Sequence, residues 1–193
     1  MVTTMRDDNH LQATLKRFAI IKGVNVFKNP WGVRRIQGVT PPSVPSFCVP
    51  SKTHALIHTM ELGRIEAPAV VLGNDLEFFG SIVLAHEIGH LIGAFIENRL
   101  TGEKGTNFRG MALYSEEIVA WRFVFAVMQA LDVKIQPWHR RRAKFALNTY
   151  RQRLRRIKGT TYDRAVSKLI DRTVRQRVKY FLETINREGK SCR

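Results

Sequence analysis

The chain has 193 residues, of which 44% are hydrophobic and 25% are charged, a composition typical of a folded domain rather than a disordered chain. Its two cysteines are too few for a disulfide-stabilised secreted scaffold, and no apolar run is long and free enough of ionisable residues to cross a membrane. Since the first ten residues are polar and lack the apolar segment of a signal peptide, we expect a cytoplasmic protein without membrane contact.

The net charge of +16 is concentrated in the last third of the chain. Residues 134–193 contain 19 Lys and Arg against 4 Asp and Glu, whereas residues 1–133 contain 13 against 12. This difference predicts a nearly neutral N-terminal body, residues 1–133, and a basic helical extension, residues 134–193, packed on that body.

The first third of the chain predicts one helix and two short strands. Apolar residues recur at helical spacing over residues 9–22, and Gly23 is expected to end this helix. A short strand is expected over residues 24–27, whereas the prolines of residues 29–50 indicate a long irregular loop. Residues 67–72 (APAVVL) predict a second strand, whose edge would be able to bind an extended peptide by backbone pairing.

The next element contains the most informative motif of the sequence. Residues 78–96 are apolar almost throughout and predict a buried helix, yet they contain His86, Glu87 and His90 in the pattern H-E-x-x-H. Residues four apart lie on one face of a helix, so both imidazoles are able to bind one metal ion. Glu87 lies beside that pair, where it would act as a general base on water at the metal. Because burying these three side chains without a partner is costly, the motif favours a metal site.

A second pair of histidines, His54 and His58, has the same spacing of four residues. No acidic residue lies nearby at a spacing that suits metal binding. We therefore interpret His54 and His58 as ordinary surface or core histidines.

A catalytic zinc ion bound by two histidines needs a third protein ligand and keeps one position for water. The metzincin pattern would place a third histidine at position 96, but this residue is Ile96, which cannot bind a metal. The alternative is a carboxylate from the next predicted helix, residues 115–128, with Ser115 as its N-cap. Glu116 and Glu117 both suit this role by their order in the chain and by their helical context.

The two motifs together resemble the ImmA/IrrE-type metallopeptidases, compact gluzincins whose members often act on phage or stress-response repressors. The resemblance covers roughly residues 67–128 and rests on His86-Glu-Ile-Gly-His90 and on Glu117-Ile-Val-Ala120-Trp-Arg-Phe123, which has the form E-x-x-A-x-x-F. At the position of Trp121 the family commonly has Asn.

This resemblance implies an α+β fold, with a mostly helical zincin-like core and a small β-sheet. It implies that His86, His90 and Glu117, rather than Glu116, bind Zn2+, and that Glu87 is the general base in the hydrolysis of a protein or peptide substrate. Tyr114 and His139 are candidate donors to the oxyanion, although each is more typical of a structural or surface position.

The basic extension predicts two amphipathic helices, residues 139–158 and 163–188, which would form a C-terminal helical hairpin. Their apolar stripes would pack against each other or against the body. We assign the arginines of both helices to the opposite, solvated faces: Arg140, Arg141, Arg142, Arg151, Arg153, Arg155, Arg156, Arg172, Arg175 and Arg177. This charge favours contact with a nucleic acid or another polyanion, without a pattern for sequence-specific recognition.

Two functions from different classes are consistent with these features. The first is a zinc-dependent metalloendopeptidase that hydrolyses a protein substrate through a metal-activated water, with Glu87 as general base. The alternative is a nucleic-acid-binding or host-interaction protein whose zincin core is structural or inactive. A purely structural metal site has no need of Glu87 beside its ligands, which favours the enzyme.

Overall fold

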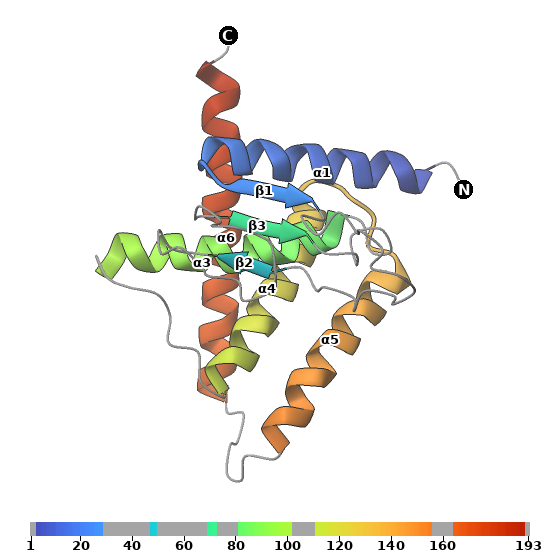
Figure 1. The fold of residues 1–193 in the computed structure, drawn as a ribbon, viewed down its shortest axis with the longest axis vertical. Helices are drawn as coiled ribbons and strands as arrows, with labels where there is room; N and C mark the ends of the chain where they lie inside the picture. The colour runs from blue at the N-terminus through green and yellow to red at the C-terminus, as the bar shows by residue number, and fades with distance from the viewer. Residues whose placement is uncertain are drawn as a thin grey trace, which may run out of the picture.

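The computed structural model describes residues 3–28, 47–49, 69–72, 81–101, 111–155 and 164–191. Within these ranges the chain is mostly helical, as expected (Figure 1). The helices are α1 (Thr3–Ile21), α3 (Ser81–Thr101), α4 (Met111–Ala130), α5 (Pro137–Arg155) and α6 (Arg164–Ser191). The strands are β1 (Asn25–Lys28), β2 (Phe47–Val49) and β3 (Ala69–Leu72). No helix of the described ranges has the length and apolar character needed to span a bilayer.

The three strands form a small sheet in the order β1-β3-β2, with β1 parallel and β2 antiparallel to β3. The central strand β3 confirms the strand predicted at residues 67–72, but both of its edges are paired, so it cannot bind a peptide by backbone pairing. Strand β2 corrects the prediction that residues 29–50 are irregular throughout. Its three residues lie between prolines, which sequence reasoning takes as loop signals but which are tolerated beside a short edge strand.

Helix α1 ends where the sequence predicts. Gly23 has a φ of +62°, a conformation that glycine adopts without strain. Two backbone hydrogen bonds cap the C-terminal end of α1, from Gly23 N to Ile20 O (3.0 Å) and from Val24 N to Ala19 O (2.8 Å). The helix begins at Thr3 rather than at residue 9, because its first turns are polar and give no apolar periodicity.

The basic helices complete the core of the body. Phe181 of α6 is fully buried and contacts Phe18 of α1 and Phe123 of α4, with ring centroids 4.8 and 5.7 Å apart. Helices α5 and α6 each pack against α4, and α6 also packs against α1 and α3 (Figure 1). The apolar stripes of the extension therefore face the body rather than mainly each other, as one of the two predicted arrangements requires.

Helix α4 corrects one further boundary. It begins at Met111, so Ser115 lies in its second turn and is not its N-cap. Residues 111–113, Met-Ala-Leu, are strong helix formers and carry no capping signal, which explains why the sequence placed the start too late.

Replacing Phe181 by alanine should lower the free energy of unfolding by about 3–5 kcal/mol, because the substitution leaves a cavity among three helices. Urea denaturation of the metal-free protein, followed by circular dichroism, measures this loss. Phe145→Ala is the matched control, since Phe145 on α5 is 68% exposed and its loss should change stability by less than about 0.5 kcal/mol. Equal unfolding midpoints for the two variants would show that α6 is not part of the core.

Candidate metal centre

The H-E-x-x-H residues lie on α3, whose first turn is fixed by α1. The Ser81 backbone N donates a hydrogen bond to Asp8 Oδ1 (3.0 Å), and Ser81 Oγ donates to the carbonyl of Asp8 (3.2 Å). A carboxylate at this place satisfies a free N–H group and interacts favourably with the helix dipole. This contact ties the start of α3, little more than one turn before His86, to the rest of the core.

Close packing of α3 on α4 brings Glu117 to the two histidines. A Cβ atom on Gly89 would lie 2.9 Å from Phe123 Cδ1 and 3.4 Å from Ala120 Cα, so glycine is needed here. Gly89 lies between the two histidines, and Ala120 lies one turn after Glu117. The small residues on the two helices thus set the distance between the imidazoles and the Glu117 carboxylate.

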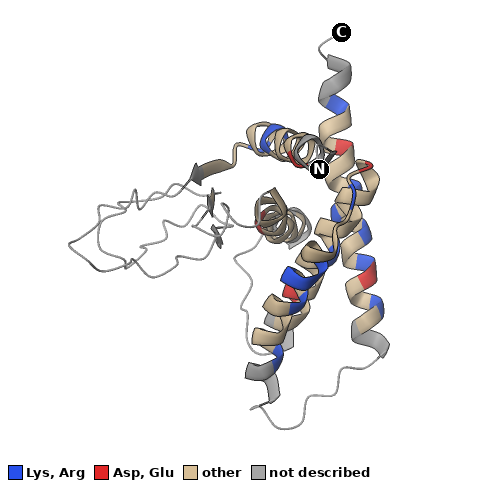
Figure 2. Ribbon diagram, turned by 90° about the vertical axis from the view of Figure 1, so that its right-hand side faces the viewer, with Lys and Arg blue, Asp and Glu red and all other residues tan. Residues whose placement is uncertain are grey.

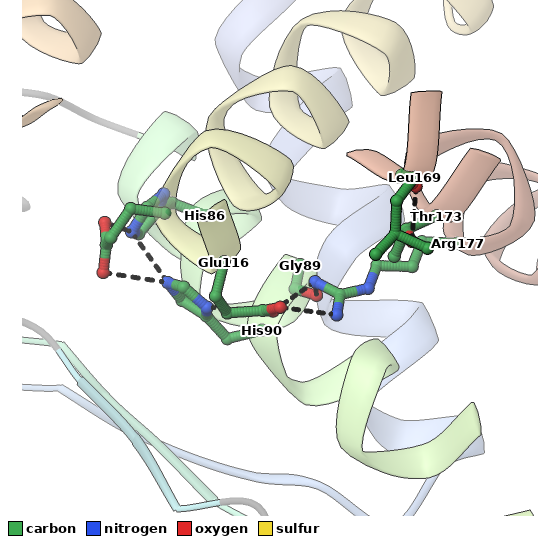
Figure 3. A network of polar contacts seen from close by, with 8 residues as sticks. His86, Gly89, His90, Glu116, Leu169, Thr173 and Arg177 are labelled. Atoms are coloured by element: carbon green, nitrogen blue, oxygen red, sulfur yellow. Dashed lines mark hydrogen bonds and ion pairs between the residues drawn. The ribbon is translucent and has the colours of Figure 1, made fainter. Parts of the chain in front are cut away.

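His86, His90 and Glu117 form a single cluster that could hold a metal ion, in which His86 and Glu117 are buried and His90 is half-buried. His86 Nε2 and His90 Nε2 are 3.1 Å apart and face each other (Figure 3). Glu117 Oε2 lies 3.3 Å from His86 Nε2, and Glu117 Oε1 lies 3.4 Å from His90 Nε2. The structure therefore places Glu117, and not Glu116, between the two histidines.

These distances fit a tetrahedral metal site. Zinc binds imidazole nitrogen at about 2.0–2.1 Å, so two ligand atoms on adjacent corners of a tetrahedron are about 3.3 Å apart. The three separations of 3.1, 3.3 and 3.4 Å are close to that value. Two imidazole nitrogens and a carboxylate are also a donor set that suits zinc and several other divalent metals. The residues present thus fit a bound metal, while the geometry leaves the identity of the ion open.

The charges of the cluster are strongly coupled. Burial lowers the pKa of His86. For His90 burial acts in the same direction, but hydrogen bonds with Glu116 and Glu117 outweigh it and raise its pKa to about 10. Burial would raise the pKa of Glu117, yet hydrogen bonds with His86 and His90 hold it well below its usual range. The raised pKa favours a protonated His90 near neutral pH when no metal is bound, and metal binding at His90 would release that proton.

Glu116 points away from the cluster centre and pairs with a residue that the sequence analysis placed wrongly. Its Oε1 lies 3.4 Å from His90 Nδ1, and both of its oxygens accept hydrogen bonds from the Arg177 guanidinium (Figure 3). Burial opposes ionisation of Glu116, but His90 and Arg177 lower its pKa to about 2. Arg177 is only 2% exposed, so it is not on the solvated face of α6.

A signal for Arg177 was present in the sequence. On α6 it follows the buried Val174 by three residues and precedes the buried Phe181 by four, so it interrupts the apolar stripe. A charged residue within such a stripe requires a buried partner. Because the whole segment is basic, the sequence analysis assigned Arg177 to the solvated face with the other arginines.

The general-base candidate and a tryptophan border the cluster. Glu87 directly follows His86 on α3 and is buried, and its negative charge is one of the contributions that raise the pKa of His90. Trp121 is buried and stacks on His86, with ring centroids 4.4 Å apart and planes inclined by 35°. Among the described residues, His86 Nδ1 and Trp121 Nε1 have no hydrogen-bond partner.

Comparisons with known proteins assign no family. No family model, curated protein or solved structure matches this chain. The likeness to the ImmA/IrrE-type peptidases thus depends on the two motifs, and the metal centre depends on the three ligand positions.

The other histidines have different outcomes. His139 is buried at the start of α5, where its Nδ1 accepts a hydrogen bond from the Gln136 backbone N (3.0 Å). This contact gives His139 a structural role at a helix terminus. His54 and His58 lie outside the described residues.

Proposed function

We propose that this protein is a zinc-dependent metalloendopeptidase with a zincin-like core, related to the ImmA/IrrE-type peptidases. The observation that carries the proposal is the convergence of His86 Nε2, His90 Nε2 and the Glu117 carboxylate at separations of 3.1–3.4 Å. The buried Glu87 beside these ligands supports catalysis, because a closed structural site uses four protein ligands and has no need of a further carboxylate.

The residues of the cluster have distinct tasks in this mechanism. His86, His90 and Glu117 would hold the zinc ion, and Glu117 would supply one negative charge toward its neutralisation. A bound zinc ion would polarise the scissile carbonyl and lower the pKa of a water molecule toward neutrality. Glu87 would accept a proton from that water on a carboxylate oxygen and then transfer it to the nitrogen of the leaving amine.

The sheet offers a place for an extended peptide. Helix α3 packs against β2 and β3, so the sheet adjoins the helix that holds the histidines (Figure 1). In the described sheet β2 pairs only with β3, which leaves its other side as an edge. A substrate strand added to that edge would satisfy its free backbone groups and run beside the metal centre.

The test of this function uses the purified full chain. We expect elemental analysis to find about one zinc ion per chain. We also expect chelation to abolish cleavage of a mixed-sequence fluorogenic peptide library and added zinc to restore it. Absence of stoichiometric metal, under conditions that load a known zinc peptidase, would contradict the metal centre. Zinc binding without cleavage of any peptide would contradict the peptidase activity alone.

Polyanion binding by α5 and α6 is a second candidate function. Lys and Arg residues recur along both helices (Figure 2). Apart from Arg177, the charged side chains described on these helices are largely exposed. Among the residues from position 134 onward whose side chains the structure describes, the exposed Lys and Arg residues are Lys134, Arg140, Arg141, Lys144, Arg151, Lys168, Arg172, Arg175, Lys179 and Arg187. A surface of this charge attracts a phosphate backbone and releases its counterions.

Affinity for a short DNA duplex should fall steeply with salt, roughly 500-fold between 50 and 200 mM if about five phosphates are contacted. Fluorescence anisotropy at several salt concentrations measures this slope. The double variant Arg140→Gln/Arg141→Gln should reduce the slope by about 2, whereas Lys16→Gln/Arg17→Gln on α1 should leave it unchanged. Point variants are required because α6 contributes to the core. A DNA affinity that does not change with salt concentration, or equal changes of the slope in the two double variants, would rule out DNA binding by the basic surface of α5 and α6.

A further inference from the structure

Arg177 belongs to α6 but contributes to the environment of the metal ligands on α3. It donates hydrogen bonds to both oxygens of Glu116 and to the carbonyl oxygen of Gly89, which is 3.0 Å from its Nη1. A buried guanidinium with both a bidentate carboxylate and a carbonyl partner is held in one orientation. Arg177 therefore fixes the position of the Glu116 carboxylate relative to α3.

Glu116 in turn contacts the side of His90 that faces away from the cluster. Its Oε1 lies 3.4 Å from His90 Nδ1, while His90 Nε2 faces His86 and Glu117. A carboxylate at Nδ1 accepts the proton of that nitrogen, which leaves the lone pair of Nε2 free to bind a metal. The same contact fixes the plane of the imidazole ring.

Gly93 provides the space that this arrangement needs. A Cβ atom at Gly93 would lie 1.9 Å from Arg177 Nη2 and 2.4 Å from its Cζ. Even alanine at this position would collide with the guanidinium. One turn of α3 after Gly89, a second glycine thus admits the Arg177 side chain from α6.

The two histidines differ in the contacts of their Nδ1 atoms. His86 Nδ1 has no hydrogen-bond partner among the described residues, and its ring instead stacks on Trp121. His90 instead contacts Glu116 through Nδ1, and Arg177 fixes the position of the Glu116 carboxylate. The described residues therefore orient His90 by polar contacts and His86 by packing.

We infer that Arg177 is a positioning residue for the metal centre, acting through Glu116 to hold His90 in the tautomer and orientation that bind the ion. This inference rests on the metal-binding part of the proposed function. Its chemical consequence is that loss of the guanidinium weakens metal binding without removing any ligand. Loss of an outer partner of a ligating histidine typically weakens metal affinity about 10–100-fold.

The test measures Zn2+ affinity of the full chain by competition with a chromophoric chelator. We expect Arg177→Met and Glu116→Gln each to bind one zinc ion at saturation, but about 10–100-fold more weakly than the wild type. The matched control is Arg175→Met, since Arg175 is exposed on the same helix and its loss should leave the affinity unchanged. If Arg177→Met fails to fold, as judged by circular dichroism, the isosteric Glu116→Gln tests the contact to His90.

Two further readouts separate positioning from general stability. The visible absorption of the Co2+-loaded protein depends on ligand geometry and should change in both variants but not in Arg175→Met. The double variant Arg177→Met/Glu116→Gln should lose no more affinity than either single variant, because both act through one path.

The outcomes distinguish the inference from the function on which it rests. If the wild type binds zinc and both single variants match its affinity and its Co2+ spectrum, the inference is wrong and the metal centre stands. If the losses of zinc affinity in the two single variants add up in the double variant, Arg177 does not act through Glu116. A wild type that binds no zinc would overturn the metal centre and the inference together.

Discussion

Glu87→Gln should retain about one zinc ion per chain and lose peptide hydrolysis by about 10²–10⁴-fold, the usual contribution of a general base. Glutamine has the shape of glutamate but cannot accept the proton of the attacking water. Glu87 is not one of the three residues that converge on the metal position, so its replacement leaves the ligand set intact.

Two measurements on the same preparation check this expectation. Elemental analysis gives the zinc content, and initial rates on a fluorogenic peptide give the activity. Glu183→Gln is the matched control, because it makes the same chemical change at an exposed position of α6 and should leave both quantities unchanged. An active Glu87→Gln protein would exclude the proposed mechanism, even if zinc were bound.

Glu117→Ala should weaken zinc binding by more than the 10–100-fold loss typical of an outer partner, because it removes a direct ligand. His86→Ala should have an effect of similar size, and both variants should lose activity with the metal. Chelator competition against the wild type measures the change. A wild type that binds zinc should also gain about 4 kcal/mol of stability at a free zinc concentration 1,000 times its Kd, and these variants should lose that gain.

The neighbouring carboxylate provides the internal comparison. Glu116→Ala changes the adjacent residue by the same chemistry, and its zinc affinity should fall between those of the wild type and Glu117→Ala. A larger loss in Glu116→Ala than in Glu117→Ala would reverse the assignment of the third ligand.

Local sequence patterns predicted the elements whose signals are local. Apolar runs and apolar periodicity located the helices, although the starts of α1 and α4 were predicted too late. The spacing of His86 and His90 on one helix predicted that their imidazoles face each other, as the structure confirms. The end of α1 at Gly23 followed from the backbone freedom of glycine. Glu117 could be chosen over Glu116 only through the resemblance, since both residues lie on the same predicted helix. The packing of α3 on α4 distinguishes the two residues, because it places Glu117 beside both Nε2 atoms and Glu116 beside His90 Nδ1.

Long-range contacts explain what the sequence analysis missed. Strand β2 exists because residues 47–49 pair with residues of β3 that are 20–24 positions later in the chain, and three residues are too few for a periodic signal. Arg177 was assigned to a solvated face because its segment is basic throughout, whereas its partners are 61 and 88 residues earlier in the chain. No window along the sequence contains both members of such a pair.

The contact between Arg177 and Gly89 has a consequence for the order of events during synthesis. The two residues are 88 positions apart, and α6 follows every other element of the metal centre along the chain. A ribosome would release α3 and α4 before α6 has been made, so the histidines would emerge without the arginine that orients the acid behind His90. Since non-local contacts form only after their loop has closed, we expect the nascent chain to acquire the proposed tight metal binding only once α6 has docked.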